Sequence, residues 1–182
     1  MQAPEHARDP LPKPNPWSAA EVKRILRERG WISGEASQEQ QAWCERAALL
    51  LGPQAADRGT LENLLTLVFH YDAVELVGQV ASHAVLSRNA ARDVLRETAL
   101  LLLDGGGLDS ERFKEIVAAL KQRLELRSRD LFHPIRLALA GKVGEGQLDR
   151  VILLIDGAAA LQWDVPVKNA RTRMVEFCSA LD

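Results

Sequence analysis

Apolar residues recur every three or four positions along most of the chain, which is the spacing of an amphipathic α-helix. The strongest example runs from Asp109 or Ser110 to about Leu126 and keeps its charged residues on the opposite side. The residues predicted to face inward there are Phe113, Ile116, Val117, Leu120 and Leu124. The same spacing predicts helices over 18–30, 37–51 and 88–103, one starting near Thr60 and one starting at Asp72.

Capping residues, glycine and proline mark the expected ends of these helices. Ser18 with Glu21 three residues later has the form of a capping box. Ser87 is expected to cap the helix over 88–103, which should end at the three glycines after Asp104. The helix that Asp72 caps should turn one apolar stripe inward, made of Val74, Val77, Val80, Ala81 and Ala84.

The last third of the chain is expected to form three shorter helices. Pro134 predicts the first turn of a helix over 134–140, which Gly141 closes. Another helix is expected over 147–155, ending at Asp156-Gly157, and a final one should run from Pro166 to Leu181. Residues 151–155 could instead form a short buried strand by composition, but their helical neighbours favour a helix. The fold class predicted is therefore all-α, a helical bundle.

Composition supports a folded protein outside the membrane. Hydrophobic residues make up 47% of the chain and charged residues 26%, values typical of globular proteins. No apolar run reaches the roughly 18 residues that a membrane span needs, and the first residues lack a signal-peptide pattern, so we expect a cytoplasmic protein. Residues 1–16 hold five prolines and are expected to form a flexible leader.

Neither a metal site nor a catalytic site is predicted. Cys44 and Cys178 are far apart in sequence and lack metal-ligand spacing, so they are interpreted as buried thiols. His70, His83 and His133 do not have the spacing of metal ligands either. No cofactor is expected, and no nucleophile motif such as Gly-x-Ser-x-Gly occurs. The formal net charge of −2 argues against a strongly basic nucleic-acid binder, so any RNA site must be local.

The segment from Phe132 to Gly141 reads FHPIRLALAG and follows an amphipathic helix and a basic turn. It resembles the C-terminal anticodon-binding region of bacterial glutamyl-tRNA synthetases, where a segment close to Phe-x-Pro-Leu-Arg-x-Ala-Leu-Thr-Gly occupies this place. Upstream, Glu45-Arg46-Ala47 and the aromatic stretch from Phe69 to Asp72 are similar to weaker patterns of the same family.

The resemblance implies two small packed helical subdomains, expected over 17–86 and 87–182. It also implies that Arg136 reaches an anticodon base and that Leu148 packs against unstacked anticodon bases. The alternatives are that Arg136 pairs with a carboxylate and that Leu148 is ordinary core. The sequence also predicts a basic face near the motif that attracts RNA. The alternative is a solvated face whose cations pair with Asp130, Glu145 and Asp149. The residues of this face are Arg127, Arg129, Arg136, Lys142 and Arg150.

The function predicted is a tRNA-binding or RNA-binding module without catalysis. The family's H-I-G-H and K-M-S-K-S-like signatures are absent from this sequence, so glutamate activation by this chain alone is excluded. Glu145 and Gly146 stand where the family usually has Thr-Pro, and a carboxylate there disfavours RNA. A protein-interaction scaffold that lost RNA binding, and the C-terminal half of a split synthetase with a synthetase partner, therefore remain as alternatives.

Overall fold

The computed structural model describes residues 15–182, and this range forms helices and connecting loops without any strand. The all-α prediction is confirmed for these residues. The predicted leader over 1–16 falls almost entirely outside them. The elements are α1 (Ala19–Glu28), α2 (Gln38–Leu51), the 3₁₀ turn η1 (Gly52–Gln54), α3 (Arg58–Phe69), α4 (Ala73–Gly78), α5 (Val80–Leu86), α6 (Ala91–Leu103), α7 (Ser110–Leu124), α8 (Ser128–Ala140), α9 (Gln147–Ala159) and α10 (Ala170–Leu181).

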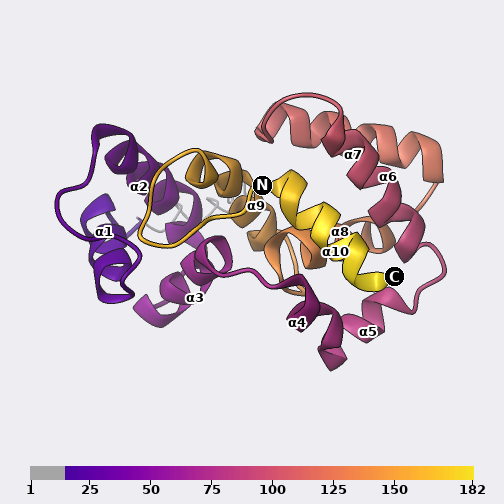
Figure 1. Ribbon diagram of the computed structural model, residues 1–182, viewed down its shortest axis with the longest axis horizontal. Coiled ribbons are helices and arrows are strands. Elements are labelled where there is room, and N and C mark those ends of the chain that lie inside the picture. Colours follow the sequence, from indigo (N-terminus) through magenta and orange to yellow (C-terminus); the bar gives the residue numbers. More distant parts are fainter. Residues whose placement is uncertain (1–14) are drawn as a thin grey trace, which may run out of the picture.

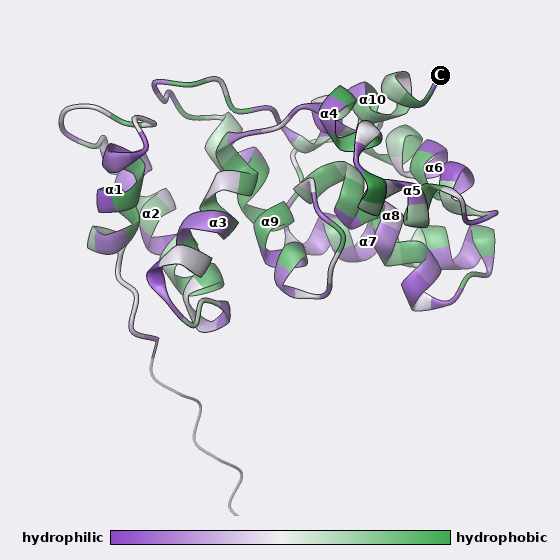
Figure 2. Cartoon of the chain, turned by 90° about the horizontal axis from the view of Figure 1, so that it is seen from below, coloured by the Kyte–Doolittle hydropathy of each residue, from purple (hydrophilic) through white to green (hydrophobic). Residues whose placement is uncertain are grey.

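The helices pack in two groups that lie side by side along the long axis (Figure 1). One group contains α1, α2, α3 and α9, and the other contains α4 to α8 and α10. Helix α9 also packs against α8 and α10 and so joins the groups. Figure 2 shows the amphipathic pattern on α1, whose hydrophilic residues lie on the side away from α2. Since both groups combine helices from before and after residue 86, the predicted subdomain boundary there stays a prediction.

The capping prediction fails at Ser18, whose side chain accepts no hydrogen bond from the first turn of α1. The second half of the box is not formed either, and the Glu21 carboxylate lies 3.3 Å from the Arg24 guanidinium. A complete capping box forms instead at the start of α2, between Ser37 and Gln40.

The predicted inward stripe after Asp72 is wrong. Asp72 does cap α4, but the helix breaks at the extended residue Gln79 and restarts as α5. The break rotates α5 relative to α4, so one stripe cannot face inward on both, and Val74 and Val80 are 75% and 86% exposed. The buried residues of the two helices are Ala73, Leu76, Ser82 and Val85. Ser87 ends α5 and does not cap the next helix, which starts at Ala91.

Three boundaries in the last third also differ from the prediction. Pro134 lies inside α8 and removes one of its backbone hydrogen bonds. The helix still begins before the proline, because its first turns bury Leu131 completely and that burial outweighs the lost bond. Helix α9 continues through Asp156-Gly157 to Ala159, since the Asp156 carboxylate accepts backbone N–H groups of other segments and leaves α9 uninterrupted. Helix α10 starts at Ala170, where the side chain of Asn169 caps it.

Candidate nucleic-acid interface

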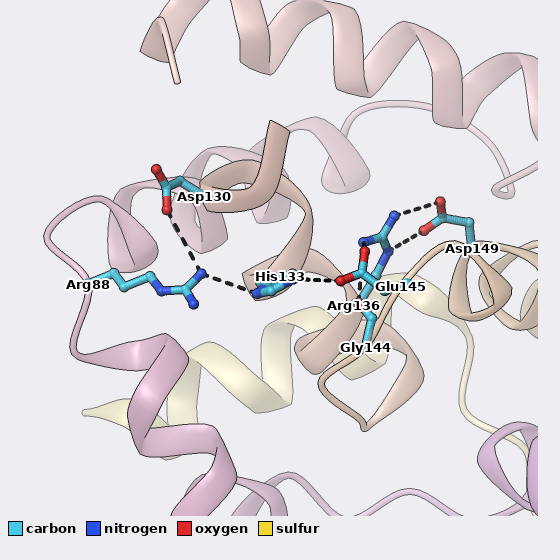
Figure 3. A network of polar contacts seen from close by, with 7 residues as sticks. All are labelled: Arg88, Asp130, His133, Arg136, Gly144, Glu145 and Asp149. Atoms are coloured by element: carbon cyan, nitrogen blue, oxygen red, sulfur yellow. Dashed lines mark hydrogen bonds and ion pairs between the residues drawn. The ribbon is translucent and has the colours of Figure 1, made fainter. Parts of the chain in front are cut away.

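Arg136 projects from α8 toward the loop 141–146, which leads into α9 (Figure 3). Its guanidinium donates two hydrogen bonds to the Asp149 carboxylate, Nε to Oδ1 at 2.7 Å and Nη2 to Oδ2 at 3.0 Å. Nη1 donates to the carbonyl of Gly144 at 3.3 Å and lies 3.9 Å from the Glu145 carboxylate. The planar group also lies over the Phe132 ring, 4.9 Å from its centre.

These contacts use the donors with which an arginine would read a base. Arg136 is only 8% exposed, and both edges of its guanidinium face protein oxygen atoms. The arrangement ties the loop 141–146 to α8 and to the first turn of α9. Carboxylate pairing, the alternative considered for Arg136, is therefore what the structure shows, and base contact by Arg136 stays a prediction.

His133 lies one helical turn before Arg136 in the same polar network (Figure 3). Its Nδ1 is 3.2 Å from Nη1 of Arg88, and its Nε2 is 3.8 Å from the Glu145 carboxylate. Arg88 also approaches Asp130 at 3.8 Å. Burial lowers the pKa of His133 below its ordinary value, and the Arg88 charge lowers it further. A neutral imidazole at physiological pH follows.

The remaining predicted RNA-binding residues fall in different environments. Leu148 is 2% exposed and belongs to the hydrophobic core, so it presents no surface to a base in this conformation. Arg127 and Arg129 are exposed at the start of α8, and Lys142 is exposed in the loop after it. Within residues 15–182, none of these three cations has a carboxylate within 4 Å. They are thus available to phosphate groups.

Lys142 lies at a groove between α3 and the start of α9, which we call the polar groove. Its volume is about 670 Å³, and α3 contributes most of its lining. The lining side chains are amides, hydroxyls, two leucines and one cation: Gln54, Thr60, Asn63, Leu64, Thr66, Leu67, Lys142 and Gln147. The groove has no carboxylate in its lining. Of these residues, only Lys142 was predicted from the sequence to bind RNA.

A second arginine, Arg173 of α10, holds α3 and α8 together through its hydrogen bonds. Its Nη1 donates to the carbonyls of Leu67 and Leu139 at 2.8 and 2.9 Å, and its Nη2 donates to Val68 at 2.6 Å. Its Nε donates to the carbonyl of Lys168 at 3.0 Å. The C-terminal turns of α3 and α8 are therefore joined through one side chain of α10.

The described part of the chain contains no helix long and apolar enough to cross a membrane, and no group of metal-binding side chains was found in it. No curated protein and no solved structure matches the sequence. The model of one protein family does match, over residues 15–156, and that family is described as an anticodon binding domain. The match covers α1 to α8 and most of α9, including the polar groove and the loop 141–146. The chain belongs to the anticodon binding domain family.

Proposed function

We propose that this domain binds an unpaired loop of a tRNA in the polar groove and performs no catalysis itself. The observation that carries the proposal is the carboxylate-free lining of a groove that falls within the region matched by the family. The protein acts in the cytoplasm, where tRNA is used.

The groove has the chemistry that exposed bases require. Asn63 and Gln147 each offer a donor and an acceptor, which can pair with the edge of an unstacked base. Leu67, which is only partly buried, supplies apolar contact for a base face, and Lys142 supplies a charge for phosphate. Sequence-specific RNA recognition mostly targets single-stranded loops, because their bases are accessible.

Arg136 acts in this proposal by holding the loop in place. Its bonds to the carbonyl of Gly144 and to Asp149 fix both ends of the segment 144–149, which carries Gln147 and follows Lys142 by two residues. Arg127 and Arg129, near the start of α8, add a non-specific attraction for the RNA backbone.

The resemblance around Phe132 to Gly141 supports a glutamyl type of specificity and a free-standing module that works with a synthetase chain. If this chain supplies the anticodon contacts for such a partner, mixing it with a glutamyl-type catalytic chain increases the charging of tRNA. Unchanged charging would dismiss the partnership, while leaving tRNA binding as a separate question.

A fluorescence anisotropy titration of labelled total tRNA at about 50 mM salt tests tRNA binding. We expect a micromolar dissociation constant, a loss of about fivefold or more for Asn63→Ala, and a flatter salt dependence for Lys142→Ala. Asn89→Ala and Lys114→Ala change the same residue types at exposed positions outside the groove and should bind as the wild type does. Absence of binding at micromolar protein, or equal binding by all variants, contradicts the proposal.

A protein-interaction scaffold is the second candidate. Glu145 is 81% exposed in the loop beside the groove, and Val74 and Val80 expose apolar surface. A pull-down from extract treated with ribonuclease distinguishes the two functions. A scaffold keeps its partners after that treatment, whereas an assembly bridged by RNA loses them.

A further inference from the structure

A second cleft lies at the C-terminal end of α3, where residues that follow α1 and the connection between α9 and α10 also line it. We call it the basic cleft; its volume is about 520 Å³. Arg29, His70 and Lys168 contribute their polar side chains to it, together with the aromatic rings of Trp31 and Tyr71. Its lining includes no aspartate or glutamate.

Arg29, His70 and Lys168 each have a carboxylate neighbour outside the lining. Arg29 lies 3.4 Å from Glu62, His70 lies 3.5 Å from Glu75, and Lys168 lies 2.8 Å from Glu176. The side chains of all three pairs are at least 29% exposed, and exposed pairs of this kind contribute little free energy. A phosphate group can therefore take over these donors at small cost.

Arg173 lies in the inner wall of the basic cleft and is completely buried. Its donors bind backbone carbonyls, and no carboxylate in the described residues lies within 4 Å of it. Its positive charge is thus only partly compensated, and burial lowers the pKa of its guanidinium to about 10. An anion in the cleft would reduce this unfavourable burial of charge.

The basic cleft and the polar groove adjoin at Thr66 of α3, which lines both of them. A smaller hollow adjoins both at Thr66, but it leads toward α4 and its lining includes the carboxylates of Asp72 and Glu75, so the RNA strand is not placed there. The ten helical steps from Thr60 to His70 correspond to about 15 Å along α3, which is room for a few nucleotides of extended RNA.

We propose that the basic cleft binds a backbone phosphate of the same RNA strand whose bases occupy the polar groove. Arg29 and Lys168 make the contact, and the strand follows α3 between the two sites. The inference rests on the proposed function, because it assigns a second contact to the same RNA.

The test compares Arg29→Gln and Lys168→Gln with the wild type by titrating labelled total tRNA over a range of salt concentrations. Each lost phosphate contact should lower the slope of log K against log salt by about 0.7 and weaken binding at low salt several-fold. The charge-retaining variant Arg29→Lys should keep most of the slope. Arg24→Gln and Lys114→Gln remove exposed, carboxylate-paired cations outside the cleft and should leave the slope unchanged.

The outcomes separate the two proposals. If Arg29→Gln and Lys168→Gln behave as their controls do while Lys142→Ala loses affinity, the basic cleft is not used and the polar groove still is. If the wild type fails to bind tRNA, both proposals are wrong. Displacement of tRNA by micromolar AMP would identify a free nucleotide as the occupant of the cleft and overturn the inference.

Discussion

Arg173 carries a fully buried charge, and within residues 15–182 only backbone carbonyls accept its hydrogen bonds. Three of the four carbonyls belong to the last turns of α3 and α8, where unpaired oxygens and the helix dipole both favour a cation. The guanidinium also lies 4.7 Å from the centre of the Tyr71 ring. One side chain therefore satisfies two helix ends that would otherwise be buried without partners.

Replacing Arg173 with methionine should lower the free energy of unfolding by about 3 kcal/mol or more, because several buried carbonyls lose their donors. Arg171→Met is the matched control on the same helix. Arg171 also donates to carbonyls, those of Leu102, Leu103 and Gly105, but it is exposed and water can replace it. Urea unfolding followed by circular dichroism measures both variants, and equal losses would contradict this account.

The roles of the arginines could be predicted from the sequence only in part. Arg173 follows Ala170 by three positions and precedes Met174 and Phe177, so it stands on the buried stripe of α10, and a charge at such a position signals a buried contact. Its acceptors could not be foreseen, because carbonyls carry no sequence signal. For Arg136, Asp149 was one of three carboxylates that the sequence offered as partners of the basic residues, but which cation each carboxylate pairs with depends on how α8 and α9 pack, and the sequence does not show that.

At the scale of single helices, the apolar stripes were predicted best where one helix runs without a break. The stripe of α7 is an example, since Ile116 and Leu120 are buried as expected and the other three predicted residues are partly buried against the core. Predictions failed where tertiary contacts decide a boundary. Helix α9 passes through Asp156-Gly157, where the Asp156 carboxylate bonds to other segments and the Trp43 ring packs with its Cδ1 atom 3.5 Å from the place a Cβ of residue 157 would take.

Two glycine substitutions should have opposite effects on stability. Gly157→Ala places a methyl group at ordinary contact distance in the interior of α9, so helix propensity should raise the free energy of unfolding by up to about 1 kcal/mol. Gly141→Ala forces a side chain onto a residue with φ of +74°, which should cost about 1 kcal/mol. Thermal unfolding of both variants checks the signs, and destabilisation by Gly157→Ala would show that Trp43 cannot accommodate the methyl group.

For the whole molecule, the all-α class followed from the sequence pattern, but the grouping of helices did not. Helix α9 is far from α2 and α3 in sequence, yet it packs against both of them. The Trp43 Nε1 atom donates to the carbonyl of Leu154, and the rings of Trp31, Trp43, Phe69 and Trp163 contact one another across the same interface. Periodicity reports which face of a helix is buried but not which helix covers it, so this arrangement could not be predicted.

The position of α9 implies that the residues before 87 depend on those after it. A fragment covering 15–86 lacks α9 and exposes the surfaces of α2 and α3 that this helix covers, so we expect low helicity and no cooperative unfolding transition. Adding the fragment 87–182 should restore the interface, raising the helical signal and burying Trp43. The intact chain should unfold in one transition that coincides by circular dichroism and tryptophan fluorescence. A fragment 15–86 that folds cooperatively alone would instead support an independent subdomain ending at residue 86.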